Sequence, residues 1–96
     1  MKHTYVVSYD IADPKRLRFV FKLMKGWGLH VQYSVFQCDL SAADATELQS
    51  ALEDIIEPSM DQVLFINVGP TKGRARGAIE ALGRPYTFPV REPVIA

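Results

Sequence analysis

The sequence predicts an α+β domain whose elements follow the order strand, helix, two strands, helix, strand. Three observations predict this order: short apolar runs typical of strands, two segments with apolar residues at helical spacing, and Pro or Gly residues between them. The length of 96 residues suits one small domain, and the apolar fraction of 48% suits a packed core. We expect a single domain, with its core over roughly residues 1–69 and a tail over roughly residues 70–96.

The first half of the chain predicts a buried strand followed by a helix. Tyr5–Tyr9 is a continuous apolar and aromatic run, as in a strand covered on both faces. Asp13 and Pro14 are suited to the N-cap and the first position of a helix, and Gly26 and Gly28 are suited to its end. The core face of this helix consists of Leu17, Val20, Phe21 and Met24.

The second half predicts further strands around a second helix. Residues 29–40 alternate in part, which indicates strand with a turn or irregularity that the pattern does not locate. Ser41 and Asp44 form a weak capping-box pattern, and Pro58 stops the helix. Residues 63–68 form the last core strand. The apolar face of the second helix consists of Ala45, Leu48, Leu52, Ile55 and Ile56.

This order is that of a ferredoxin-like βαββαβ sandwich, with both helices on one face of the sheet. The strands are too apolar for the other face to stay bare in water, so we expect a covering partner and a two-fold homodimer. After Gly69-Pro70, the tail predicts a short helix around residues 78–82 and a Pro-bounded edge strand over residues 86–95, added to a neighbouring subunit.

The formal net charge of zero hides a segregation of charge along the chain. Between Gly26 and Thr71 there is no Lys or Arg, while basic residues gather on either side of this span. Such a distribution indicates a face for an anionic partner, or alternatively two solvated helices of opposite sign. The basic residues are Lys15, Arg16, Arg18, Lys22 and Lys25 before the span, and Lys72, Arg74, Arg76, Arg84 and Arg91 after it.

Asp10 is the most prominent candidate for chemistry, because it lies where the first apolar strand stops and just before the basic helix. A carboxylate at a strand end, with arginines nearby, suggests a metal-bound phosphate. The alternative is that Asp10 only satisfies backbone donors in a turn. The single Cys38 excludes an internal disulfide and a thiolate zinc site. No apolar run reaches the length of a membrane span, and we expect a cytoplasmic protein without a signal peptide.

Three stretches together resemble one family. They are Val-Val-Ser-Tyr-Asp-Ile over residues 6–11, the basic segment 13–18, and Val-Gln-Tyr-Ser-Val-Phe-Gln-Cys over residues 31–38. With Asp61-Gln62-Val63 before the last core strand, they make the chain similar to CRISPR-associated protein two over nearly its whole length. The family often has Arg where this chain has His30, and His is mostly uncharged at neutral pH.

The resemblance implies a ferredoxin-like homodimer whose sheets pack face to face and whose C-terminal strands join the partner's sheet. It implies a metal-dependent endonuclease acting on RNA or duplex DNA, or a non-catalytic scaffold that holds a prespacer duplex between copies of the CRISPR integrase. A more distant alternative is a small-ligand regulatory domain, against which the basic stripe and the two motifs argue. The functional positions that match are Tyr9, Asp10, Arg16, Arg18, Ser34 and Phe36.

These residues suggest a mechanism. Asp10 and its two-fold copy would share one Mg²⁺, with Mn²⁺ as the alternative metal, because one carboxylate binds such an ion poorly. Arg16 and Arg18 would contact phosphate, while Tyr9 and Ser34 would orient water or phosphate. Phe36 would pack in the sheet or stack on a base. The nucleic-acid contacts would come from Lys15, Arg16, Arg18, Lys22, Arg74 and Arg76, although Arg74 and Arg76 could equally serve to solubilise the tail.

Overall fold

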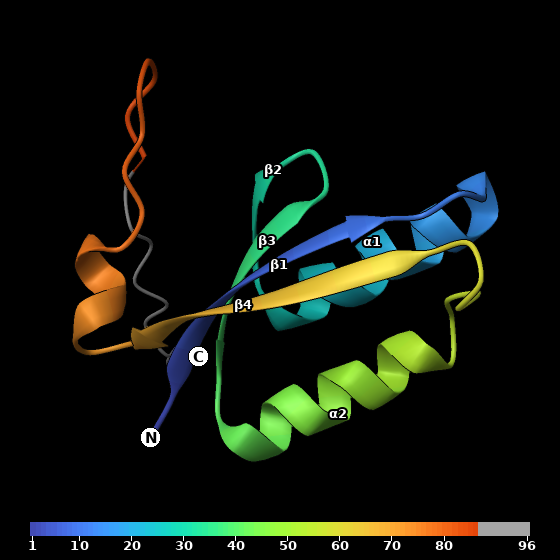
Figure 1. The fold of residues 1–96 in the computed structure, drawn as a ribbon, viewed down its shortest axis with the longest axis horizontal. Coiled ribbons are helices and arrows are strands. Elements are labelled where there is room, and N and C mark those ends of the chain that lie inside the picture. The colour runs from blue at the N-terminus through green and yellow to red at the C-terminus, as the bar shows by residue number, and fades with distance from the viewer. Residues whose placement is uncertain (87–96) are drawn as a thin grey trace, which may run out of the picture.

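A computed structural model describes residues 1–86 and confirms the α+β fold. Four antiparallel strands form one sheet in the order β2-β3-β1-β4. This is the ferredoxin-like arrangement that the order of elements predicts. The elements are β1 (His3–Asp10), α1 (Pro14–Trp27), β2 (Leu29–Gln32), β3 (Val35–Leu40), α2 (Ala42–Glu53), β4 (Gln62–Pro70) and the 3₁₀ helix η1 (Arg74–Gly77), shown in Figure 1.

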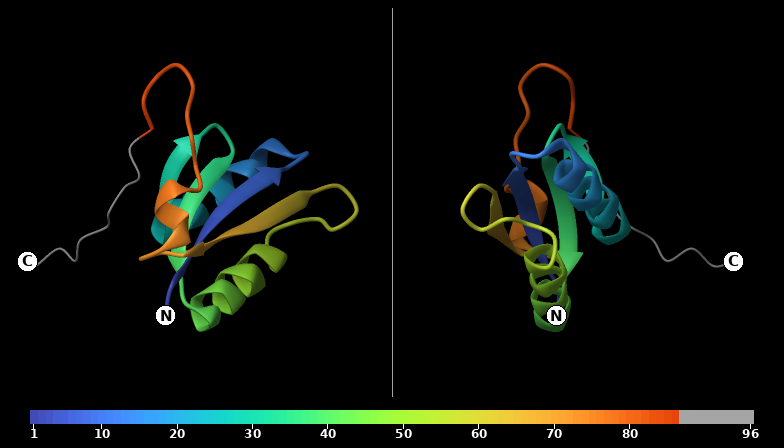
Figure 2. Two further views of the ribbon diagram at one scale, coloured as in Figure 1. Left: turned by 60° about the vertical axis from the view of Figure 1, so that its left-hand side comes forward. Right: turned by 90° about the vertical axis from the view of Figure 1, so that its right-hand side faces the viewer.

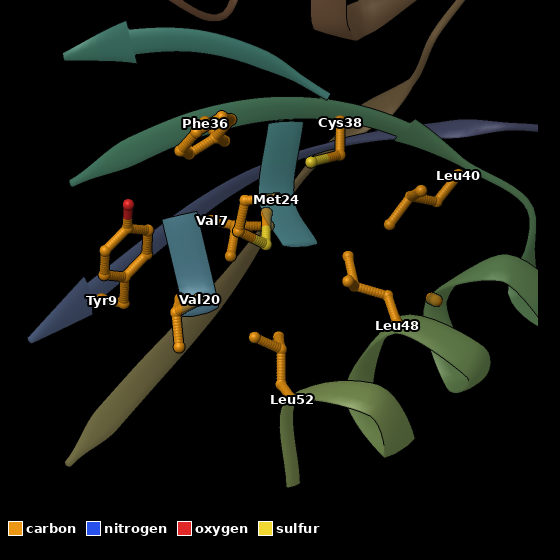
Figure 3. Close-up of a cluster of buried hydrophobic side chains, with 10 residues drawn as sticks. Val7, Tyr9, Val20, Met24, Phe36, Cys38, Leu40, Leu48 and Leu52 are labelled. Carbon is orange, nitrogen blue, oxygen red and sulfur yellow. The ribbon is translucent and has the colours of Figure 1, made fainter. Parts of the chain in front are cut away.

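Both helices cover the same face of the sheet, where they share one hydrophobic core (Figures 1 and 2). Helix α1 contributes Val20 and Met24, and α2 contributes Leu48 and Leu52 (Figure 3). The sheet contributes alternate residues of its two central strands, as the two-residue period of a strand requires. These residues are Val7 and Tyr9 of β1 and Phe36, Cys38 and Leu40 of β3.

The predicted helix starts are confirmed in detail. Asp13 caps α1, since its carboxylate accepts a hydrogen bond from the Arg16 backbone N–H at 2.9 Å. At α2, Asp44 N–H donates to Ser41 Oγ at 3.1 Å and Ser41 N–H donates to the Asp44 carboxylate at 3.3 Å. The capping box is therefore complete although Asp replaces the usual Glu or Gln.

Two boundaries differ from the prediction. Helix α2 ends at Glu53, well before Pro58, because Ile55 and Ile56 both donate their N–H groups to the Leu52 carbonyl in a tight turn. The tail forms η1 at Arg74–Gly77, so the helix predicted around residues 78–82 is wrong. The turn that the sequence pattern could not locate occupies residues 33–34, between β2 and β3.

Gly28, directly after α1, is required by a close approach rather than by its backbone angles. Its φ of −158° is ordinary extended backbone. A Cβ at this position would lie 2.5 Å from both the Gln37 carbonyl oxygen and Cys38 Sγ. Only a residue without a side chain lets the end of α1 pass this close to β3.

The opposite face of the sheet is only partly covered. Residues 79–86 form a groove of about 460 Å³ with β1, β2 and β3, and the Tyr86 hydroxyl donates to the side-chain oxygen of Gln37. Leu64 and Ile66 on β4 remain 47% and 48% exposed. A face-to-face homodimer stays a prediction, and the predicted edge strand over residues 86–95 lies almost entirely outside the described residues. Among residues 1–86, no helix is long and apolar enough to cross a membrane.

Candidate nucleic-acid and metal site

Asp10 is exposed at the end of β1, where it pairs with Gln62 of β4. Val7 and Tyr9 point into the core, so alternation along the strand places Asp10 on the opposite, partly covered face together with Val6. Within residues 1–86, no side chain or backbone group forms a hydrogen bond or ion pair with the Asp10 carboxylate. Its oxygens are therefore available to a ligand, and the alternative that Asp10 caps a turn is not what the structure shows.

Other predicted site residues lie at the same end of the sheet. The Tyr9 N–H donates to the Ser34 carbonyl at 3.1 Å, which places the turn between β2 and β3 beside the end of β1. Helix α1 begins four residues after Asp10, and Lys15 and Arg18 are exposed in its first two turns. The fold thus brings Asp10, Ser34 and part of the basic stripe to one edge.

Asp61 is the residue that the sequence reasoning did not single out as part of the site. Its side chain is fully buried and accepts hydrogen bonds from Ala12 N–H at 2.9 Å and Glu57 N–H at 2.8 Å. It also forms a two-pronged ion pair with Arg16, at 2.7 Å from Nε and 3.1 Å from Nη2. The Arg16 hydrogen bond and the two backbone donors hold the pKa of Asp61 far below its ordinary value. The signal in the sequence was an Asp directly before an apolar strand.

Arg16 is bonded within the fold, and its predicted phosphate contact stays a prediction. Two of its three guanidinium nitrogens are committed to Asp61, and this hydrogen bond raises the pKa of Arg16. Arg16 therefore acts within the fold, as the partner of a buried carboxylate. Arg18, two residues further along α1, is exposed, and its phosphate contact stays a prediction.

The two aromatic candidates belong to the core. Phe36 is 0% exposed and packs against Tyr9, with ring centroids 6.2 Å apart. Packing in the sheet is the alternative that this burial supports, and stacking of Phe36 on a base stays a prediction. Tyr9 is 5% exposed. The pKa of its hydroxyl is raised, mainly by burial and secondly by the neighbouring Tyr33. Its predicted role in orienting water or phosphate has no support from this placement.

The basic residues of the tail lie at the other end of the sheet. Arg74 and Arg76 belong to η1, which follows the end of β4 where Pro70 pairs with His3. They are exposed, like Lys15, Arg18 and Lys22, but they follow the opposite end of the sheet from the start of α1, and β1 between the two ends is about 23 Å long at roughly 3.3 Å per strand residue. The structure therefore divides the predicted nucleic-acid contacts into two groups.

His30, which stands where the family often has Arg, is held by its neighbours. Its ring stacks on Phe36 with centroids 4.9 Å apart and meets the edge of Phe21 at 5.0 Å. Its Nε2 lies 3.0 Å from the Tyr33 carbonyl oxygen, to which it donates in the matching tautomer. These contacts give His30 a structural role at the turn between β2 and β3.

The described residues of one chain offer few ligands for a divalent metal. No group of three His, Cys, Asp or Glu side chains gathers within residues 1–86. Asp13 and Asp61 are committed to hydrogen bonds, which leaves Asp10 as the available hard oxygen ligand at this edge. Mg²⁺ accepts one or two carboxylates and completes its shell with water and phosphate. Asp10 fits such a site if a second copy supplies another carboxylate.

Comparison with known proteins identifies relatives of this chain by sequence. The sequence model of the family described as CRISPR associated protein Cas2 matches residues 3–75. A Rhodospirillum rubrum protein named CRISPR-associated endoribonuclease Cas2 1 is 46% identical over 98% of this chain and 91% of its own length. A Geobacter sulfurreducens protein named CRISPR-associated endoribonuclease Cas2 is 35% identical over 99% of each chain.

Solved structures give the same result. The crystal structure of Streptococcus pyogenes Cas2 has a TM-score of 0.71 and 35% identity, and covers 83% of this chain and 99% of that one. A hypothetical protein from Thermus thermophilus reaches a TM-score of 0.76 at 28% identity, over 88% of this chain and 94% of its own. From these matches in sequence and in fold, the chain belongs to the CRISPR-associated protein Cas2 family.

Proposed function

We propose that this protein is a metal-dependent endonuclease that hydrolyses phosphodiesters, with RNA as its first candidate substrate and duplex DNA as the second. The observation that carries the proposal is the exposed, uncommitted Asp10 carboxylate beside the basic start of α1. The relatives are named endoribonucleases, which favours RNA as the substrate. Mg²⁺ or Mn²⁺ would supply Lewis acidity and an activated water when bound.

The residues of the chain have distinct tasks in this proposal. Two copies of Asp10, brought together when the partly covered sheet faces pair, would hold the ion. Arg18 and Lys15 would bind the phosphates on either side of the scissile bond. Attack of water on phosphorus forms one P–O bond and breaks the bond to the leaving sugar oxygen, which takes up a proton. The pairing of two chains is part of the proposal because one chain presents a single uncommitted carboxylate at this edge.

Substitution of Asp10 tests the proposal. We expect Asp10→Asn to reduce cleavage of end-labelled RNA and duplex DNA to the background seen with EDTA, while thermal stability and nucleic-acid affinity stay near wild type. Glu47→Gln, which neutralises an exposed carboxylate on α2, is the matched control and should cleave like wild type. Retained Mg²⁺-dependent cleavage by a highly purified Asp10→Asn protein would contradict the proposal.

A second candidate is a non-catalytic scaffold in spacer acquisition, which bridges copies of the CRISPR integrase on a DNA duplex. The observation that favours it is the presence of exposed basic residues both on α1 and on η1, which follow opposite ends of the sheet. A duplex that follows both groups would contact Arg18 and Lys22 at one end and Arg74 and Arg76 at the other.

The salt dependence of duplex binding tests the scaffold. Replacing Arg74 and Arg76 by Gln should lower the slope of log affinity against log salt by about one per lost phosphate contact, and Arg18→Gln with Lys22→Gln should do the same. If only one pair of substitutions changes the slope, the duplex does not follow both ends of the sheet. Integration assays with the integrase then decide whether Asp10→Asn has any effect on spacer acquisition.

A further inference from the structure

Asp61 ties together three segments that are distant in sequence. Its Oδ1 accepts from Ala12 N–H and Arg16 Nη2, and its Oδ2 accepts from Arg16 Nε and Glu57 N–H, at 2.7–3.1 Å. The donors belong to the loop after β1, the first turn of α1, and the loop between α2 and β4. A single buried carboxylate therefore fixes the relative positions of these segments.

The backbone around Asp10 is held on two sides, across the sheet and along the chain. Across the sheet it pairs with Gln62, which is the residue directly after Asp61. Along the chain, Ala12 lies two residues after Asp10 and donates its N–H to Asp61 at 2.9 Å. The backbone that carries the Asp10 carboxylate is thus fixed on both sides through the same residue.

We propose that Asp61, with Arg16 as its partner, is a positioning residue that sets where the Asp10 carboxylate stands at the cleavage site. This inference rests on the metal-dependent role proposed for Asp10. The alternative is that the ion pair only stabilises the fold, as buried pairs in many proteins do, or is neutral to it. The position of the hydrogen bonds favours the first interpretation, since they hold the loop that carries Asp10.

The size of the expected effect follows from geometry. Displacement of a reacting group by about 1 Å costs on the order of a hundredfold in rate. An Asn at position 61 keeps one acceptor oxygen and replaces the other by an amino group, which faces donors and cannot accept. We therefore expect Asp61→Asn to lower kcat about a hundredfold, with KM for the nucleic acid within about threefold of wild type.

The control variant must lose stability without changing the loop that follows β1. Ser41→Ala removes the cap of α2, and Ser41 follows β3 at the end where Leu40 pairs with His3, opposite to Asp10. Activity is measured at a temperature at which every variant is fully folded. Loss of activity in Asp61→Asn but not in Ser41→Ala supports positioning, whereas equal effects in both variants overturn it.

A second readout does not depend on cleavage. Hydrogen exchange of the backbone amides, followed by NMR, should show that Asp61→Asn accelerates exchange at Ala12 and loosens residues 10–13 while the core strands stay protected. If residues 10–13 keep their wild-type exchange rates, the positioning role is overturned even if activity falls. If instead the wild type does not cleave, or Asp10→Asn still cleaves, the proposed function fails and the exchange data still decide the role of Asp61.

A milder variant covers the case in which Asp61→Asn does not fold. Arg16→Met removes the ion pair but leaves Asp61 its two backbone donors, so it should lower kcat less than Asp61→Asn does. Arg16→Lys, which restores a positive charge without the fork, should recover part of that loss. Wild-type kcat in Arg16→Met, together with unchanged exchange at Ala12, would contradict the role of Arg16.

Discussion

Side-chain hydrogen bonds hold the two ends of β1 to neighbouring segments in different ways. At the His3 end, one carboxylate and two hydroxyls close the sheet: the buried Thr4 hydroxyl donates to Asp39 at 2.7 Å and shares a hydrogen bond with Thr71 at 3.0 Å. At the Asp10 end, the buried carboxylate of Asp61 accepts hydrogen bonds from Ala12, Arg16 and Glu57. The second carboxylate at that end, Asp10, is left without a partner among the described residues.

The two ends therefore differ in how many carboxylates are committed to hydrogen bonds. Ala12 N–H and the Arg16 fork both lie near the end of β1, yet both are bonded to Asp61. Asp61 is thus committed to the fold, whereas the Asp10 carboxylate has no partner among the described residues. At the His3 end, Asp39 and the two threonines satisfy one another.

The largest expected effect concerns the Asp10 end of β1, where Arg16 and Asp61 form an ion pair. Asp61→Ala leaves Arg16 and two backbone N–H groups without their acceptor, so we expect Tm to fall by roughly 10 °C or more. Asp39→Ala at the other end leaves the Thr4 hydroxyl still bonded to Thr71, so we expect a fall of only about 4–8 °C. Calorimetry of both variants at pH 7 measures the difference. Similar falls in Tm would show that the two ends are energetically equivalent.

Lowering the pH should weaken the stabilising contribution of Asp61 at the Asp10 end. The Arg16 hydrogen bond lowers the pKa of folded Asp61 below the value of about 3.9 expected in the unfolded chain. The unfolded chain therefore takes up the proton first, and the stabilising contribution of Asp61 is complete above about pH 4 and declines as the pH falls below it. We expect the Tm gap between wild type and Asp61→Asn to shrink by several degrees between pH 5 and pH 2.5. A gap that does not change with pH would contradict the ionised state of Asp61.

The smallest expected effect concerns the His3 end of β1. Thr71→Val removes one hydroxyl, but Thr4 keeps its bond to Asp39, so we expect a loss of about 0.5–1 kcal/mol in the free energy of unfolding. Thr46→Val, which removes an exposed hydroxyl bonded to Ala42, is the matched control with a smaller loss. Urea unfolding measures both. Cleavage should be unchanged in Thr71→Val, and a loss of activity would show that the two ends are coupled.

Local patterns were enough to predict most of the fold. Asp13 with Pro14, and Ser41 with Asp44, mark helix starts because capping involves residues three positions apart. The order of strands and helices follows from apolar periodicity for the same reason. The end of α2 was misplaced because the Leu52 carbonyl accepts two N–H groups in a turn, which no Pro or Gly announces. The predicted helix after residue 77 failed because helical spacing in a short Gly-rich segment gives little information.

Only part of the candidate site could be predicted from the sequence. Asp10 was found because it stops an apolar run, which is a local signal. The ion pair of Arg16 and Asp61 joins residues 45 positions apart, so in the sequence Arg16 looked like one more member of a basic stripe. Tyr9 and Phe36 were included because they lie within the motifs that resemble the family, but their side chains are part of the core. Contacts across the fold decide which charges remain available, and no local pattern records them.

The alternation of β1 has a consequence for how this chain can change over generations. Tyr9 belongs to the core and Asp10 to the opposite face solely because one is odd and the other even along the strand. Deleting or inserting a single residue between Val6 and Asp10 would send the carboxylate into the core and the phenol ring into water. Length variation in this strand is therefore tolerated only in pairs of residues. We expect indels in related chains to fall in the loops at the two ends of β1.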